Sequence, residues 1–98
     1  MEREKFYIVR TYSAGVWAGN IKERNKQEVT MTNAIRLWQW QGANTLSEIA
    51  MVGVGKPQNC KFSMPVDEVL LLQAIEIIEA TPEAERNIKS VEVLPWWK

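Results

Sequence analysis

Residues 6–40 read FYIVRTYSAGVWAGNIKERNKQEVTMTNAIRLWQW, and this stretch decides the fold. Three runs within it, residues 6–12, 16–24 and 28–40, are rich in β-branched and aromatic residues and predict strands. Short segments with turn-forming residues separate the runs. We therefore expect two consecutive hairpins that form an antiparallel meander.

Two irregularities are expected within the meander. Gly19 lies inside the second run, where glycine often marks a bulge or a close backbone approach. The third run first alternates, with Val29 and Met31 facing inward, and then loses its phase at Asn33-Ala34. A bulge near Asn33 would bend the strand and change which of its faces is buried.

The middle of the chain predicts a short helix, a loop and two further strands. The sequence TLSE at residues 45–48 fits a capping box, and Gly53 is a plausible helix end. Residues 53–59 read as a loop. Residues 61–66 alternate and predict an edge strand, because Pro65 lacks a ladder donor. Residues 68–80 are apolar on both faces, which favours a central strand or one bent between two packed layers.

The C-terminal part predicts a second helix and a return to the sheet. Thr81, Pro82 and Glu83 fit the first positions of a helix that reaches about Lys89. Residues 91–93 alternate and could rejoin the sheet. We expect one α+β domain spanning residues 1–98: a small, strongly bent antiparallel sheet or an SH3/Sm-like barrel, with two short helices.

Composition excludes several chemistries. Twelve basic residues balance twelve acidic ones, which counts against a protein that coats DNA. The sequence contains no histidine, so Ser-His-Asp, Cys-His and histidine–metal sites are excluded. Cys60 is the only cysteine, so an internal disulfide or a thiolate zinc site is excluded too. We expect a non-enzymatic protein without catalytic residues, metal or cofactor.

The location expected from the sequence is the cytoplasm. The longest apolar run, residues 69–72, is far shorter than the roughly 20 residues that span a bilayer. The charged residues 1–5 do not resemble a signal peptide. No membrane contact is therefore expected.

Three motifs carry a family resemblance: YSAGVWAG at residues 12–19, NAIRLWQW at 33–40 and KPQNCKF at 56–62. Together they resemble an uncharacterised family of small phage and prophage proteins. The resemblance implies an accessory phage protein acting in the host-cell cytoplasm, with action against a host defence as one role. It implies no mechanism and no site residues.

Tryptophans supply the candidate binding surface. Trp38 and Trp40 alternate on one predicted strand beside Arg36, and Trp17 lies on the neighbouring strand. Indole rings and a guanidinium can stack a nucleobase and pair a phosphate. The same tryptophans could instead be core or subunit-contact residues. The candidate ligand-binding residues are Trp38, Trp40, Trp17, Arg36, Arg10 and Asn33.

Two other features bear on partners. Trp96 and Trp97 follow Pro95, and they are expected to dock either on their own domain or against another subunit. Lys22, Arg24 and Lys26 give the second hairpin a positive charge, more typical of a solvated face than of a phosphate site. In a homo-oligomer, symmetry would gather such patches around one groove.

The leading hypothesis is a binding protein that acts as a homo-oligomer. It would bind either a host defence protein or a small nucleotide-like signalling molecule, which it would sequester without acid–base chemistry. The alternative is a small nucleic-acid-binding β-barrel, in which aromatic rings stack bases. The neutral charge makes nucleic acid the less favoured partner.

Overall fold

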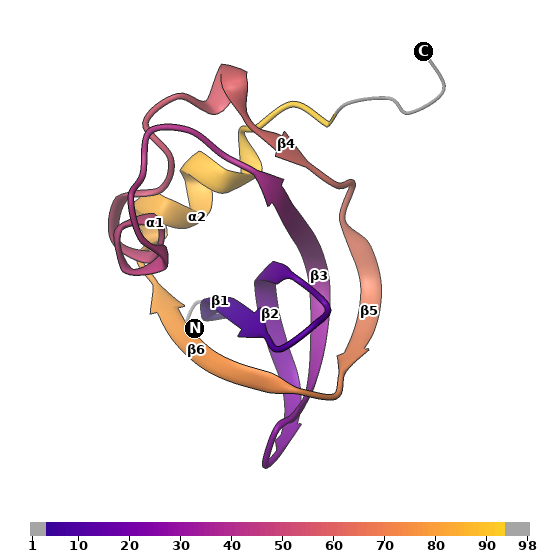
Figure 1. Ribbon diagram of the computed structural model, residues 1–98. Coiled ribbons are helices and arrows are strands. Elements are labelled where there is room, and N and C mark those ends of the chain that lie inside the picture. Colours follow the sequence, from indigo (N-terminus) through magenta and orange to yellow (C-terminus); the bar gives the residue numbers. More distant parts are fainter. Residues whose placement is uncertain (1–3, 94–98) are drawn as a thin grey trace.

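The computed structural model describes residues 4–93, and its core element is an antiparallel meander (Figure 1). β1 (Phe6–Thr11), β2 (Val16–Asn25) and β3 (Glu28–Gln39) follow the three predicted runs closely. β1 pairs with β2, and β2 pairs with β3. The local pattern of β-branched and aromatic residues was therefore enough to place these strands.

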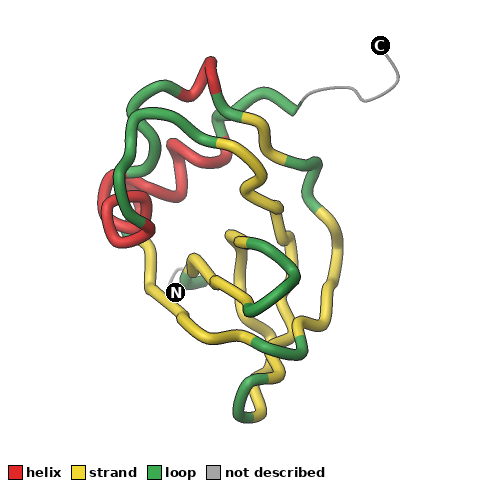
Figure 2. Tube along the Cα trace, in the orientation of Figure 1, coloured by secondary structure: helices red, strands yellow, loops and turns green. Residues whose placement is uncertain are grey.

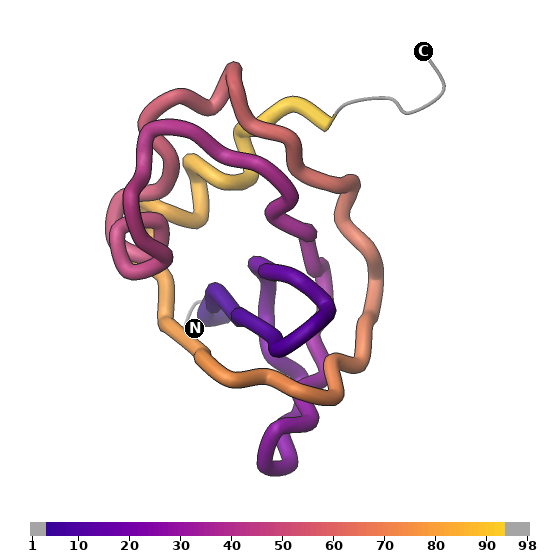
Figure 3. Tube along the Cα trace, viewed as in Figure 1, coloured from indigo at the N-terminus to yellow at the C-terminus, as the bar shows by residue number. Residues whose placement is uncertain are grey.

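The remaining strands extend the sheet at both edges. The C-terminal end of β3 pairs with β4 (Lys61–Phe62), and its N-terminal half pairs with β5 (Val66–Leu71). β6 (Ala74–Ala80) pairs with β1 at the opposite edge. Figure 3 shows the segment that contains β5 and β6 running in orange around the meander. The sheet is antiparallel and strongly bent, as predicted.

The described strand pairing does not close the sheet. Its order is β4-β3-β2-β1-β6, with β5 also on β3, so a barrel is not shown. β5 and β6 are nevertheless consecutive in the chain, separated by Leu72 and Gln73. The prediction of one continuous strand over residues 68–80 was therefore wrong, because two strands occupy this segment. The bend that was one of the two alternatives for this segment is present.

Backbone hydrogen bonds hold the bend between β5 and β6. The Tyr12 amide donates to the Gln73 carbonyl at 2.9 Å, and the Ala74 amide donates to the Gln27 carbonyl at 3.0 Å. Tyr12 lies in the β1–β2 turn and Gln27 in the β2–β3 turn, and both turns are far from residues 72–74 in sequence. A reading of residues 68–80 by themselves could not reveal these partners.

Two other strand predictions need correction. The strand expected over residues 61–66 ends after Phe62, although the Ser63 amide still donates to the Arg36 carbonyl at 3.0 Å. Strand pairing with β3 resumes at Val66, the first residue of β5. Residues 91–93 form no strand. Val91 instead lies buried in the core beneath the helices.

The bulge expected near Asn33 is present. Asn33 has a φ of 50°, and the β2–β3 register shifts between Ala18 and Asn20. A Cβ atom on Gly19 would lie 2.9 Å from the Thr32 carbonyl oxygen, so glycine permits this close approach. Beyond the bulge, β3 contributes Ile35 and Leu37 to the opposite face of the sheet from Met31.

Both predicted helices form (Figure 2). Each has a threonine as its N-cap residue. In α1 (Leu46–Val52) the Thr45 hydroxyl accepts from the Glu48 amide at 3.1 Å. In α2 (Pro82–Lys89) the Thr81 hydroxyl accepts from the Ala84 amide at 3.0 Å. Residues 57–59 form a short 3-10 helix. Within residues 4–93, no helix has the length and apolar character needed to cross a membrane.

The two faces of the sheet bury two separate cores. The helix-side core joins strand residues to α1 and α2; it includes Phe6, Ile8, Leu37, Ile49 and Ile88. The strand core draws its buried residues from strands alone; it includes Val9, Trp17, Met31, Leu71 and Ala74. Helices cover one face, whereas the curl of the sheet encloses the other.

Candidate binding surface

Arg36 and Trp17 form a stacked pair on the strand-core face. They are register partners on β3 and β2, and the Arg36 Cζ atom lies 4.4 Å from the centre of the Trp17 ring. Trp17 is 5 % exposed, and its Nε1 donates to the Ala14 carbonyl at 3.0 Å. Arg36 itself remains exposed. The fixed ring thus holds an outward-facing guanidinium by a cation–π contact.

Trp38 follows on the same face as Arg36, because alternate residues of a strand share a face. Its side chain is 57 % exposed. Trp40 lies elsewhere: β3 ends at Gln39, and the Trp40 ring packs half-buried against the helix-side core. The predicted pair of neighbouring indoles is therefore not found, since the strand ends before the alternation could continue.

Ser63, in the segment after β4, lies beside Arg36. The Arg36 amide donates to the Ser63 hydroxyl at 2.9 Å, and the Ser63 amide donates back to the Arg36 carbonyl. Met64 comes next in the chain and is 62 % exposed. We call the exposed side chains of Arg36 and Trp38, which share one face of β3, the Arg36–Trp38 surface. Within residues 4–93, Arg36 has no carboxylate at ion-pair distance.

Arg10 and Asn33 lie apart from this surface. Arg10 alternates with Ile8 on the helix-side face, and its Nε lies 3.3 Å from the Glu76 carboxylate. Asn33 occupies the bulge, and its side chain donates to that of Asn20 at 3.4 Å. The structure therefore brings together Trp17, Arg36 and Trp38 among the candidate ligand-binding residues. Trp96 and Trp97 lie outside the described residues.

Sequence reasoning missed two features. Ser63 was not singled out, because its position beside Arg36 depends on long-range hydrogen bonds to the Arg36 backbone. A cavity that includes Tyr7, Arg24 and Ile77 was missed as well, since three different strands contribute to it. The charge on the second hairpin was the one signal that pointed toward this cavity.

Comparison with known proteins places the chain in a family. A family model described as "Domain of unknown function (DUF6948)" matches residues 4–88. The chain belongs to this family. No match was found among curated proteins or solved structures. The matched residues include all the described strands, α1 and α2 except for Lys89, and they include Arg36 and Trp38.

Proposed function

We propose that this DUF6948 chain is a non-enzymatic binding protein that captures a protein partner through the Arg36–Trp38 surface. The observation that carries the proposal is an indole 57 % exposed beside a guanidinium already stacked on a buried ring. Tryptophan, arginine and methionine are enriched in the centres of protein interfaces. Two of these types, arginine and tryptophan, share this face of β3.

The energetics favour this surface as a hot spot. A tryptophan buries about 150–250 Å² when it is covered. Stacking on Trp17 restricts Arg36 before a partner arrives, so less side-chain entropy is lost on binding. Truncation of such anchors commonly costs about 2 kcal/mol or more, equivalent to roughly thirty-fold in affinity.

The partner class that we propose is a host protein, and the role is that of a phage accessory protein that blocks a host defence. This part rests on the likeness of the three sequence motifs to phage and prophage proteins, not on the surface itself. We also propose that the protein forms a homo-oligomer in the host cytoplasm, with Trp96 and Trp97 at the subunit contact. Oligomerisation would multiply the Arg36–Trp38 surface in one particle.

We further propose that the bent sheet is an SH3/Sm-like barrel left open along one seam. β5 and β6 are separated by two residues and pair with opposite edges of the meander. The Ala74–Gln27 hydrogen bond crosses the gap between the β2–β3 turn and β6. A small barrel of this kind would present side chains from several strands on one compact surface.

Single-stranded nucleic acid is the second candidate partner. An exposed indole beside an exposed arginine could stack a base and contact a phosphate. The balanced net charge speaks against this candidate. Titration of single-stranded RNA and DNA at low and high salt separates the two: saturable, salt-sensitive binding that is lost in Trp38→Ala would favour nucleic acid.

Photo-crosslinking tests the protein-partner proposal. A photoreactive amino acid is placed at position 38 and, as a control, at position 12, because Tyr12 is an aromatic residue 76 % exposed in the β1–β2 turn. We expect a discrete host-protein adduct from position 38 and none from position 12. The purified adduct partner should then bind the wild-type chain and lose affinity for Trp38→Ala. Equal binding of wild type and Trp38→Ala would contradict the proposal.

A further inference from the structure

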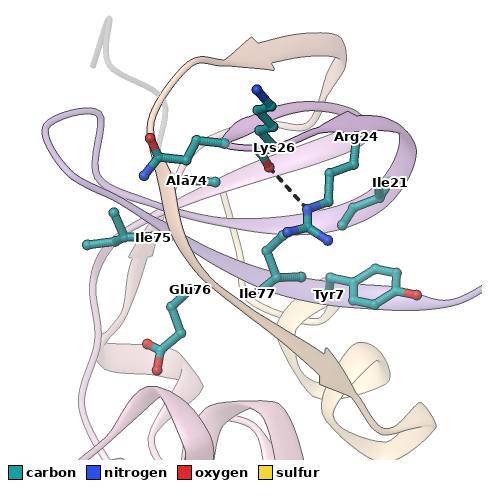
Figure 4. Close-up of a pocket in the computed structure, with 9 residues that line it drawn as sticks. Tyr7, Ile21, Arg24, Lys26, Ala74, Ile75, Glu76 and Ile77 are labelled. Atoms are coloured by element: carbon teal, nitrogen blue, oxygen red, sulfur yellow. Dashed lines mark hydrogen bonds between the residues drawn. The ribbon is translucent and has the colours of Figure 1, made fainter.

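An open cavity of about 720 Å³ lies on the strand-core side, between β6 and the tip of the β2–β3 hairpin (Figure 4). This volume falls in the range of roughly 300–1,000 Å³ that is typical of small-molecule sites. Residues from β1, β2, β6 and the β2–β3 turn line it. None of them belongs to the Arg36–Trp38 surface.

The cavity exists because the sheet does not close. The Ala74 amide donates a hydrogen bond to the Gln27 carbonyl in the β2–β3 turn. From there β6 pairs with β1 and not with β2 or β3, which form the hairpin. The gap exposes the edge of the strand core. Tyr7, Ile21 and Ile77 pack against that core and remain half-buried, so they form an apolar floor with one aromatic ring.

Two cations stand at the rim of this floor. The Arg24 Nε donates to the Lys26 carbonyl at 3.2 Å, which fixes the guanidinium across the turn and leaves its other N–H groups for a ligand. In the part of the chain that the structure describes, neither Arg24 nor Lys26 pairs with a carboxylate. Glu76 also lines the cavity, but it pairs with Arg10, and Figure 4 shows it directed away from Arg24.

Lys26 occupies a backbone conformation that does not suit lysine. Its φ is 58°, in the left-handed region that glycine and asparagine adopt more readily. The turn geometry therefore gives no reason for lysine at this position. The positive charge at the cavity rim does give one.

We infer that this cavity binds a small organic anion that joins a flat apolar group to a phosphate. The apolar group would lie on Tyr7, Ile21 and Ile77, while the phosphate would receive hydrogen bonds from Arg24 and the ammonium of Lys26. A planar guanidinium and an ammonium together match the charge and the several oxygens of a phosphate. The site is independent of the protein-binding surface proposed above.

Nuclear magnetic resonance titration of the isotope-labelled full chain tests this site with defined probes. Phenyl phosphate carries both ligand parts, while phenol and inorganic phosphate each carry one; adenosine monophosphate offers a larger ring. We expect saturable amide shifts at Tyr7, Arg24, Lys26 and Ile77, with a Kd below about 1 mM for phenyl phosphate or adenosine monophosphate. Phenol and inorganic phosphate should bind at least about tenfold more weakly, because each makes half of the contacts.

Matched variants identify the groups responsible. Arg24→Gln and Lys26→Asn should each raise the Kd by about tenfold, since a charge-assisted hydrogen bond is lost. Lys56→Gln removes an exposed cation far from the cavity in sequence and should leave the Kd unchanged. Asparagine suits the left-handed turn, so Lys26→Asn should fold normally.

Three results would overturn the inference. The first is the lack of any saturable shift up to ~10 mM of every probe, a concentration that corresponds to negligible affinity. The second is a set of shifts confined to residues outside the cavity, or a Kd that Arg24→Gln and Lys26→Asn do not change. The third is tighter binding of a single-stranded oligonucleotide than of adenosine monophosphate, which would assign the cations to nucleic acid. None of these results alters the predicted behaviour of Trp38→Ala toward a protein partner.

Discussion

The two cores of this protein differ in what covers them. The helix-side core is sealed by α1 and α2, and the side chain of Asn87 ties the loop after α1 to α2. The strand core is enclosed by the curl of the sheet alone, and it is incompletely covered at the seam beside β6. Both proposed binding sites lie on the strand-core face. Both faces therefore bury fully enclosed side chains, such as Ile49 on one and Met31 on the other, but only the strand-core face carries the proposed binding sites.

The largest expected effect is a loss of stability in the helix-side core. Ile49 is fully buried, so Ile49→Ala should lower the free energy of unfolding by about 2–5 kcal/mol. Ile77 is half-buried in the strand core, and Ile77→Ala should cost less than about 2 kcal/mol. Urea unfolding of both variants measures the difference. Equal losses would contradict the expectation that incomplete cover at the seam lowers the contribution of Ile77 to stability.

The second-largest loss in the free energy of unfolding is expected for Asn87→Ala. Its side chain accepts from the Val54 amide at 2.7 Å and donates to the Val54 carbonyl at 3.0 Å. Asn87→Ala leaves two backbone groups of a buried residue without these partners, so we expect a loss of about 2–3 kcal/mol. Asn59→Ala is the control, because that exposed side chain bonds to exposed Gln41 and should change stability by less than about 0.5 kcal/mol. A small effect of Asn87→Ala would show that these two hydrogen bonds contribute little to holding the loop after α1 against α2.

Trp38→Ala should separate binding from stability. The exposed ring contributes little to the fold, so the free energy of unfolding should change by less than about 1 kcal/mol. Affinity for the crosslinked partner should fall roughly thirty-fold, measured by calorimetry. Tyr12→Ala, which removes another exposed ring, should leave the affinity unchanged. A large loss of stability in Trp38→Ala would make the ring a structural residue instead.

The smallest effect is expected at the β2–β3 turn. Lys26→Gly relieves a left-handed conformation and should raise the free energy of unfolding by up to about 1 kcal/mol. The same change should weaken phenyl phosphate binding, so stability and affinity should move in opposite directions. Thermal unfolding and the titration described above measure the two quantities. A less stable glycine variant would show that the lysine side chain supports the turn.

Local signals predicted much of the fold. Thr45 and Thr81 marked both helix starts, and the loss of phase at Asn33 marked the bulge, because each depends on residues close in sequence. The break at Leu72–Gln73 was not predictable, since hydrogen bonds to distant turns produce it. The barrel expected as one alternative is not shown by the strand pairing.

The candidate site was predicted only in part for the same reason. The contact between Arg36 and Trp17 follows from two paired strands, and strand alternation was enough to suggest it. Trp40 was misplaced because the end of β3 depends on its pairing with β4. The cavity was missed because its lining depends on where the sheet fails to close.

One rival surface lies on the helix-covered side. Met51 and Val52 of α1 are 58 % and 51 % exposed, so they too could bury apolar area against a partner. They offer no aromatic ring and no stacked arginine. This surface therefore provides a direct alternative to the assignment of binding to the strand-core face.

Amide chemical-shift mapping of the labelled chain with its crosslinked partner decides between the two faces. We predict that the largest shifts fall at Arg36 and Trp38, with little change along α1. Shifts centred on Met51 and Val52, with the Arg36–Trp38 surface unaffected, would contradict this prediction.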